Sequence, residues 1–434
     1  MKYIVLASLI SLATASIAAA AASPRYTVVE LATASSEFTV ALSLPESNER
    51  ARKLVSRAPL LGLSAQIHSP RCGKRALHQH KAGVWIVPYK CVEVMWTVRA
   101  KRVPQAGADV SKQNTLRFSH PSWFLFSEPT SLLRLENDNG QSTITFKATS
   151  RGSSSVGATR VVDGVWRIPS PNNAPEFFAL GHLSSTTQNI GRFRVKYVAD
   201  NGERVDRLGL KAMHERALSY LARALPPSTT TPDADLDLLV MWVGIHERTG
   251  RAGGAAGSRS FVANYVFGKP ENEHVNAART LAILAHEQFH QLADLVRGDM
   301  PPLPIWLNES LAQYYGLKAL QHAAPSSSAN TVMARFVDPL RPISSGLLEL
   351  DRRHAAHDPR AYPLIYEQGA TFWSEIDLAI SSATNGSGSL DDLVSELLRS
   401  DLPDGGQLPE SFVSKLRERI GAKADALIRI YVGS

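Results

Sequence analysis

The segment AHEQFHQLADLVRGDMPPLPIWLNESLAQYYG, residues 285–316, contains two histidines four positions apart with a glutamate between them. On a helix of about 3.6 residues per turn, His286 and His290 project from one face, one turn apart. Two imidazoles placed in this way can bind one zinc ion. Glu287 would lie beside that ion, where it can take a proton from a water molecule that the zinc activates. The pattern therefore predicts a hydrolytic zinc site.

A catalytic zinc ion needs a third protein ligand, which we expect from the following helix. The first helix should end near Gly298, because the prolines of DMPPLP cannot continue it. IWLNESLAQYYGLKAL then has the pattern of a second helix that can return alongside the first. Eighteen residues separate His290 from Glu309, enough to bring this carboxylate back to the metal. We therefore predict that His286, His290 and Glu309 bind one Zn²⁺ per chain, and that Asp294 is a candidate to orient His290.

The alternative is a histidine pair in the core of an ordinary helix, with incidental acidic residues nearby. The nearly all-apolar surroundings of ARTLAILAHEQFHQLADLVRG fit any helix that crosses a domain interior. The break after it and the Trp-Leu-Asn-Glu start of the next helix favour the zinc site.

HEQFH, followed after eighteen residues by the glutamate of WLNES, resembles the gluzincin metallopeptidases. The nearest groups are the aminopeptidase-N-like and glycyl-aminopeptidase families, where WLNEG or a close relative carries the third ligand. YPLIYEQG, residues 362–369, resembles their Tyr-Glu-Lys-Gly segment. The resemblance implies a thermolysin-like catalytic domain that follows a β domain and precedes helices. It also implies that Tyr366 donates a hydrogen bond to the tetrahedral oxyanion, with Tyr362 as the nearby alternative.

Three features depart from the pattern of those families. Their aminopeptidases carry a glutamate in a glycine-rich strand before the zinc helix, and it binds the amino terminus of the substrate. GGAAGSRSFVANYVFG, residues 253–268, contains no acidic residue, so cleavage at a chain end and cleavage within a chain both stay open. Ser310 replaces the glycine after the ligand, and Gln313 stands where some relatives have an acid that orients a zinc histidine. FVANYVF is a candidate edge strand for a bound peptide, with Asn264 as a contact.

The chain outside the motif divides into a β-rich part and a helical part. VEVMWTVRAK, TITFKAT and RFRVKYV alternate apolar and polar residues, as strands with one buried face do. We expect these strands to form an antiparallel sandwich. RAGGAAGSRS is typical of a glycine-rich loop between the strands LDLLVMWVGI and FVANYVFG. The sequence predicts a multidomain α+β protein with a signal peptide (1–22), a β-sandwich-like domain (23–204), a thermolysin-like zinc catalytic domain (205–321) and a helical C-terminal region (322–434).

The first residues and the two cysteines indicate an exported protein. MKYIVLASLISLATASIAAAAASPR has one lysine, an apolar run and small residues before a polar start, which is typical of a secretory signal peptide. A membrane anchor is the alternative, although the alanine-rich end is weakly apolar. No later segment is apolar enough to span a membrane. We expect Cys72 and Cys91 to form a disulfide, because companions for a metal site are absent. The expected location is periplasmic or extracellular.

The composition is compatible with a large folded enzyme. Of the 434 residues, 44% are hydrophobic, and the formal net charge is +7. Lys and Arg are dispersed rather than clustered, which argues against a nucleic-acid partner.

The sequence thus predicts an exported zinc metallopeptidase acting on a peptide or protein substrate, in which zinc and Glu287 activate water and Tyr366 stabilises the oxyanion. The competing hypothesis is a weakly active or inactive protein of the same fold that binds peptides or envelope polymers. Nothing in the sequence indicates the oligomeric state.

Overall fold

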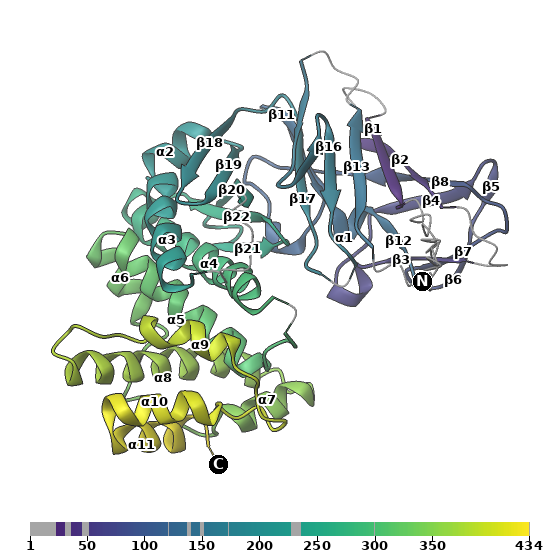
Figure 1. The fold of residues 1–434 in the computed structure, drawn as a ribbon. Helices are drawn as coiled ribbons and strands as arrows, with labels where there is room; N and C mark the ends of the chain where they lie inside the picture. Colours follow the sequence, from purple (N-terminus) through teal and green to yellow (C-terminus); the bar gives the residue numbers. More distant parts are fainter. Residues whose placement is uncertain are drawn as a thin grey trace, which may run out of the picture.

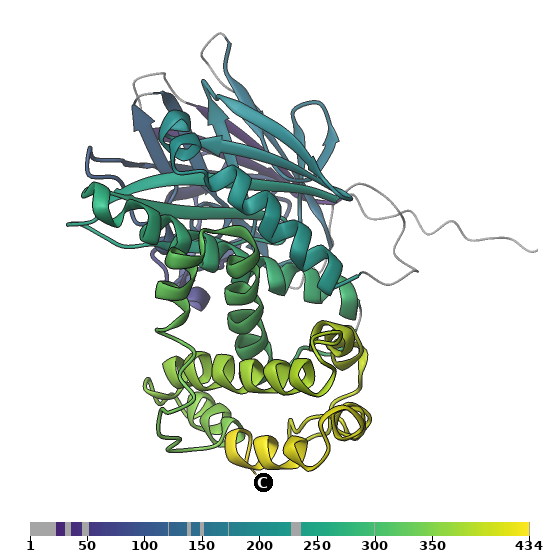
Figure 2. The same ribbon diagram turned by 90° about the vertical axis from the view of Figure 1, so that its left-hand side faces the viewer.

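The computed structural model describes residues 23–30, 36–45, 52–119, 121–136, 140–147, 152–171, 173–226, 236–298 and 300–433. The signal peptide expected at residues 1–22 lies outside these residues. The described part combines four β-sheets with a helical region, and the C-terminal helices, coloured yellow-green to yellow, lie below the sheets in Figures 1 and 2. The chain is therefore a mixed α+β protein, as expected.

Three sheets form the N-terminal part. The first has the order β15-β16-β13-β1-β2-β8-β4-β5, the second β14-β17-β11-β10-β9, and the third β12-β3-β7-β6. Their strands, with two short 3-10 helices and one short α-helix, are β1 (Arg25–Glu30), β2 (Glu37–Ser43), β3 (Arg52–Ser56), η1 (Pro59–Leu61), β4 (Ile67–Cys72), β5 (Arg75–Ala76), β6 (His78–Lys81), β7 (Val84–Val87), β8 (Glu93–Arg99), β9 (Lys101–Arg102), η2 (Val110–Lys112), β10 (Leu116–Ser119), β11 (Ser122–Ser127), α1 (Glu128–Ser131), β12 (Leu133–Leu135), β13 (Ser142–Lys147), β14 (Ser154–Val156), β15 (Arg160–Val162), β16 (Val165–Ile168) and β17 (Phe177–Gly181).

These sheets pack as a sandwich around one apolar core. Phe38 on β2 meets Phe124 on β11 across that core, with ring centroids 4.6 Å apart. Alternate residues of β11 face the other way, so this strand is buried on both sides. The expected all-antiparallel pairing is wrong at two places, because β9 pairs with β10, and β1 with β13, in parallel. The register of β1 and β13 is fixed by the apolar side chains that both strands direct into the core.

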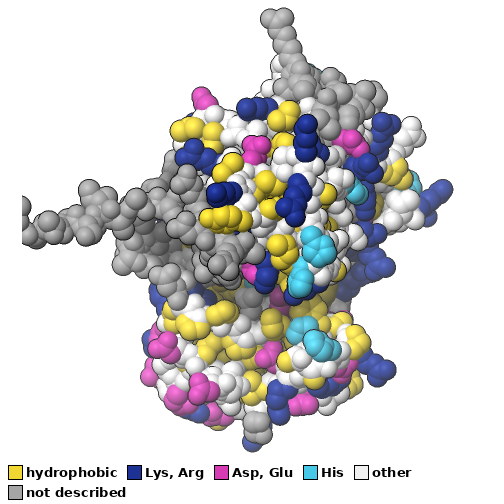
Figure 3. Space-filling model, turned by 90° about the vertical axis from the view of Figure 1, so that its right-hand side faces the viewer, with side chains coloured by type: hydrophobic (Ala, Val, Ile, Leu, Met, Phe, Trp, Pro, Cys, Tyr) yellow, Lys and Arg dark blue, Asp and Glu magenta, His cyan; other side chains and the backbone are white. Residues whose placement is uncertain are grey.

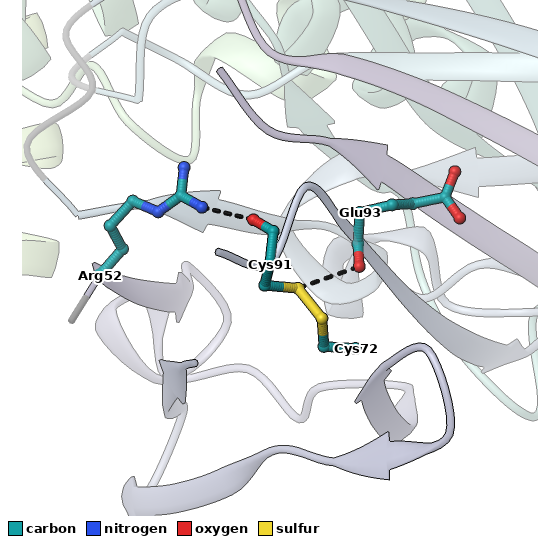
Figure 4. Close-up of a disulfide and its surroundings, with 4 residues drawn as sticks. All are labelled: Arg52, Cys72, Cys91 and Glu93. Carbon is teal, nitrogen blue, oxygen red and sulfur yellow. Dashed lines mark hydrogen bonds between the residues drawn. A yellow bond between two sulfur atoms is a disulfide. The ribbon is translucent and has the colours of Figure 1, made fainter. Parts of the chain in front are cut away.

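The expected disulfide joins Cys72 and Cys91 at the edge of the sandwich (Figure 4). Their Cα atoms are 6.1 Å apart, which is an ordinary separation for a disulfide. Arg52 donates a hydrogen bond to the Cys91 carbonyl oxygen and so ties β3 to the same loop. The disulfide therefore closes the segment of chain that contains β5, β6 and β7.

The fourth sheet carries the candidate site and has the order β18-β19-β20-β22-β21. Its strands are β18 (Ser185–Ile190), β19 (Phe193–Ala199), β20 (Leu236–His246), β21 (Gly253–Ala256) and β22 (Ser260–Phe267). β19, β20 and β22 pair in parallel, and β18 and β21 are antiparallel edges. β18 and β19 come before residue 205 in the chain, but they join this sheet. The fourth sheet therefore contains strands from both sides of the domain boundary expected between residues 204 and 205. Alternation alone does not tell a strand which sheet it will join.

One face of the fourth sheet packs on the sandwich, and the other packs on helices. Leu239, Met241 and Val262 contact the outer face of the β11 sheet, including Trp123 and Leu125. The opposite face joins a single large core that extends from β19 to the C-terminal helices. The helices are α2 (Gly202–Arg207), α3 (Leu210–Ala224), α4 (Pro270–Arg297), α5 (Ile305–Ala323), α6 (Ser326–Met333), α7 (Leu347–Ala355), α8 (Ala361–Ala383), α9 (Asp391–Arg399), α10 (Glu410–Ile420) and α11 (Ala422–Tyr431).

The surface matches the dispersed charge of the sequence. Figure 3 shows Lys and Arg side chains spread over one face of the molecule, separated by side chains of other kinds. Among the described helices, none is long and apolar enough to cross a bilayer.

Candidate active site

Helices α4 and α5 position the expected metal ligands. α4 carries both histidines and ends at Gly298, whose φ of 61° is easily adopted by glycine. α5 begins at Ile305, beyond the prolines, and returns along α4. A Cβ atom at Gly316 would lie 2.9 Å from the backbone nitrogen of His286. The absence of a side chain there lets α5 lie directly against the turn of α4 that carries His286.

The structure brings His286, His290 and Glu309 together. His286 Nε2 lies 3.2 Å from both His290 Nε2 and Glu309 Oε2, and His290 Nε2 lies 3.4 Å from the same carboxylate oxygen. Four ligands about 2.0–2.1 Å from a zinc ion, at the corners of a tetrahedron, are separated by about 3.3–3.4 Å. The three atoms thus have the spacing of one face of a zinc tetrahedron, and the donor set fits zinc.

Asn308 orients His290. The Asn308 Oδ1 atom lies 3.1 Å from His290 Nδ1 and can only accept, so the ring carries its proton on Nδ1. The lone pair of Nε2 then points towards the ligand cluster. Asn308, and not the candidate Asp294, is thus the residue that contacts Nδ1 among the described residues. Asn308 takes this position because it directly precedes Glu309 and reaches the cluster from the same turn of α5.

His286 has no such support in the structure. Its Nδ1 atom is buried without a hydrogen-bond partner among the described residues, and so is the Oε1 atom of Gln313. Both residues line the same cavity. The bond expected between Gln313 and a zinc histidine is not formed.

Tyr366 on α8 also contacts the cluster of expected ligands. Its hydroxyl donates to Glu309 Oε2 at 2.7 Å and lies 2.9 Å from the Tyr362 hydroxyl. Its ring stacks on His286, with centroids 5.4 Å apart. Burial, and next the charge of Glu309, hold the pKa of Tyr366 well above its usual range. Tyr366 therefore keeps its proton and is a hydrogen-bond donor to the cluster of expected ligands.

Glu309 is held in its ionised form. Burial opposes ionisation, but the imidazoles of His286 and His290 beside the carboxylate outweigh it and lower the pKa of Glu309 below its usual range. The same carboxylate raises the pKa of His290, against the effect of burial. An ionised carboxylate between two imidazoles is the form that a cation binds.

The serine that follows the ligand is accommodated by a glycine on α8. A Cβ atom at Gly369 would lie 2.2 Å from the Cβ atom of Ser310. The Ser310 hydroxyl accepts a hydrogen bond from Trp373 Nε1 at 2.8 Å. The departure at Ser310 is therefore matched by its surroundings, and it fixes α5 against the helix that carries Tyr366.

Two cavities meet at Glu287. One, the His286 cavity, has a volume of about 510 Å³ and is lined by His286, Glu287, Tyr366 and residues 250–252. The other, the His290 cavity, has a volume of about 640 Å³ and is lined by Glu287, His290, Asn308 and residues 256–259. Glu287, which is half-buried, borders both. The expected general base thus stands at the junction, beside the expected metal ligands.

β21 connects the two cavities. The residues before it line the His286 cavity, and those at its end and beyond line the His290 cavity. Among the described strands, β21 pairs only with β22 and is the edge of its sheet. β22, expected to be the edge, is internal, and Asn264 is fully buried, with its amide bonded to Ala108 and Val243 carbonyl oxygens. Gly253–Ala256, expected to be part of a loop, form a strand. Glycine and alanine have little strand preference of their own, but β22 supplies the hydrogen-bond partners for their backbone.

Comparison with models of known families and with curated proteins found no match. Among solved structures, the chain is similar to an aminopeptidase N family protein from Idiomarina loihiensis. The TM-score is 0.65 and the identity 12%, over 95% of this chain and 76% of that chain. A looser likeness, with a TM-score of 0.49 and 13% identity over 95% of this chain and 92% of the other, links it to an M1 zinc metallopeptidase from Deinococcus radiodurans. At 12% identity the likeness to the Idiomarina loihiensis structure shows the fold alone, and the fold of this chain is aminopeptidase-N-like.

Proposed function

We propose that the protein is a zinc-dependent peptidase that hydrolyses peptide bonds within an extended segment of its substrate. One observation carries the proposal. Glu287 and the three converging ligand atoms lie where two cavities meet, alongside an edge strand that runs from one cavity to the other. This arrangement holds a peptide and a hydrolytic centre at the same place.

His286, His290 and Glu309 would hold the metal. Zinc bound there supplies Lewis-acid activation of water and of the scissile carbonyl group. Glu287 takes a proton from the attacking water as general base and passes it to the leaving amine. Because Glu287 borders both cavities, it can reach the water and the amine without a change of helix position.

Tyr366 stabilises the charge that develops on the carbonyl oxygen. Its hydroxyl keeps its proton and already points at the ligand cluster. A correctly placed donor of this kind contributes about 2.7–4 kcal/mol to transition-state stabilisation. Tyr362 lies within hydrogen-bond distance of Tyr366 and limits the movement of its hydroxyl.

β21 would hold the substrate by strand addition. A peptide paired with its outer edge forms main-chain hydrogen bonds that do not depend on sequence. The four residues of β21 span about 13 Å at about 3.3 Å per residue, so such a peptide continues into both cavities. β21 contains only glycine and alanine, with no carboxylate to bind an amino terminus. These features favour cleavage within a chain.

We also propose that the protein is exported to a periplasmic or extracellular compartment. Two observations support this: the signal-like pattern of residues 1–22, and the disulfide between Cys72 and Cys91. Disulfides persist mainly in oxidising compartments.

Metal content and hydrolysis test the proposal directly. The purified protein should contain about one zinc ion per chain and should cleave a quenched casein or peptide library, with activity lost on chelation. Glu287→Gln should keep the zinc and lose about 10²–10⁴-fold in rate. Glu271→Gln, an exposed glutamate on the same helix, is the matched control and should behave like the wild type. A metal-free protein, or full activity in Glu287→Gln, would overturn the proposal.

The position of cleavage is a separate measurement. Peptides acetylated at the amino end and amidated at the carboxyl end should be cut internally, as mass spectrometry of the products will show. Cleavage confined to residues with a free amino group would contradict the proposed binding along β21.

One observation favours a second candidate, a binding protein of the same fold. His286 Nδ1 and Gln313 Oε1 are both buried without partners among the described residues, which weakens the support of one metal ligand. If hydrolysis is absent both with and without chelator while peptides still bind, this second candidate is the correct one.

A further inference from the structure

The His286 cavity has an excess of positive charge. Arg251, Arg279 and Arg335 line it, against the acids Glu247 and Glu287. In the part of the chain that the structure describes, none of these three arginines forms an ion pair with a carboxylate, although many other arginines do. Cations that line a cavity without a carboxylate partner are free to bind an anionic group.

Arg279 lies in line with the metal site. It stands seven residues before His286 on α4, which corresponds to about 10 Å along the helix and a rotation of about 20°. Arg279 Nη1 donates to Asn276 Oδ1 at 3.1 Å, while its Nε atom is buried without a partner. About 10 Å equals about three residues of an extended peptide. Arg279 is therefore within reach of a group close to the scissile bond.

Arg335 adds a second charge to the same place. It follows α6 and lines the cavity with Arg279. Burial, and next the charge of Arg335, lower the pKa of Arg279. Glu247 is engaged elsewhere, where its carboxylate accepts hydrogen bonds from the Lys269 backbone N–H and the Asn272 side chain.

Glu247 also lies farther from the ligand cluster than Arg279. Its partner Asn272 stands seven residues before Arg279 on α4, about 10 Å farther along the helix. Arg279 thus lies between Glu247 and the ligand cluster along α4.

We propose that Arg279, with Arg335 beside it, binds a carboxylate of the substrate within about three residues of the scissile bond. The inference rests on the proposed function and names its substrate class: peptides that carry an acidic group on the His286 side of the site. The carboxylate can come from an Asp or Glu side chain or from the free carboxyl end of a short peptide. Both sources present the same planar anion to a guanidinium group.

Binding of labelled peptides to zinc-loaded Glu287→Gln tests the inference without need for turnover. Three peptides suffice: a neutral one amidated at its carboxyl end, the same peptide with Glu placed two or three residues from the central bond, and a shortened neutral peptide with a free carboxyl end at that distance. Fluorescence anisotropy should show at least one acidic peptide binding about tenfold more tightly than the neutral one. Whichever of the two responds identifies the source of the carboxylate.

Substitution of the arginine gives the decisive comparison. In the same background, Arg279→Gln should bring the affinity for the acidic peptide to within about twofold of the neutral one, and leave the neutral affinity unchanged. Arg279→Lys keeps the charge and should retain part of the preference. The control is Arg352→Gln, at an exposed arginine paired with Glu349 on α7, which should have no effect.

Equal binding of acidic and neutral peptides, or a preference that survives Arg279→Gln, would overturn the inference. Hydrolysis of the neutral peptide by the wild type tests the proposed function independently of this result.

Discussion

Asn308 fixes the ring of His290 through the nitrogen that faces away from the ligand cluster. This residue holds no metal itself, but it decides which nitrogen carries the proton and therefore where the lone pair points. The neighbouring ligand, His286, lacks an equivalent acceptor, because Gln313 makes no bond to it. The two histidines of the motif are thus unequal, and each can be tested by one substitution.

Asn308→Ala should weaken zinc binding by about 10–100-fold, because His290 loses the acceptor that orients it. Competition with a chromogenic chelator measures the affinity. Asn330→Ala, at an exposed position on α6, is the matched control and should bind zinc like the wild type. An unchanged affinity in Asn308→Ala would show that His290 is oriented in some other way.

Gln313→Glu should strengthen zinc binding by up to about tenfold. A carboxylate at this position can accept a charge-assisted bond from His286 Nδ1–H, which has no partner in the described part of the chain. The same chelator competition measures the gain. Weaker or equal binding would mean that burial of the added charge outweighs the new bond.

The convergence of His286 and His290 could be predicted from the sequence because helical spacing places them on one face whatever the surroundings. Asn308 could not be assigned, since its role depends on the rotation of α5 against α4. β21 was missed because Gly253 and its neighbours have no strand preference of their own. Arg279 gave no signal either, because only folding brings Arg335 from α6 into the same cavity.

At the scale of elements, the site depends on how closely α5 packs against its neighbours. α4 approaches α5 at Gly316, and α8 approaches α5 at Gly369. Both glycines lie where a side chain would meet the adjacent helix. The absence of a Cβ atom therefore sets the distance between α4 and α5, and between α5 and α8. These contacts place the ligand Glu309 between His286 and Tyr366.

Gly369→Ala should lower the free energy of unfolding by about 1–3 kcal/mol, because the added methyl group overlaps the Cβ atom of Ser310. Urea denaturation measures the change. The double variant Gly369→Ala with Ser310→Gly removes the overlap and should recover part of the loss. The recovery will be incomplete, since Trp373 Nε1 loses its acceptor. No recovery would place the cause of the destabilisation outside this contact.

At the scale of the whole molecule, Glu176 joins the sandwich to the fourth sheet. Its Oε1 atom accepts hydrogen bonds from the backbone nitrogens of Arg259 and Ser260 and from the Ser260 hydroxyl. Arg259 lines the His290 cavity, so the sandwich helps to hold one wall of the site. Burial raises the pKa of Glu176 to about 7, although these hydrogen bonds lower it.

This shift predicts a loss of stability as pH rises. Below about 4.5, the ordinary pKa of Glu176, both folded and unfolded chains hold the proton, and the folded state has its full advantage. Between about 4.5 and 7 only the folded chain holds it, so stability falls as pH rises, by up to about 3 kcal/mol from this group.

Glu176→Gln tests this linkage, because Gln keeps an oxygen acceptor in the same place but does not titrate. Urea denaturation of the two proteins at pH 5 and at pH 7.5 should show a smaller decrease for the variant. Equal decreases would show that Glu176 does not titrate between these values.

The large core shared by the site helices and the C-terminal helices has a consequence for the metal. A zinc ion held by α4 and α5, with the α8 hydroxyl bonded to one of its ligands, would act as a removable cross-link at the centre of that core. An ion bound only by the folded chain stabilises it by mass action, and the stabilisation extends to every helix that unfolds with the site. Resistance of the C-terminal helices to an added protease would therefore report metal occupancy, and this measurement needs no substrate of the protein itself.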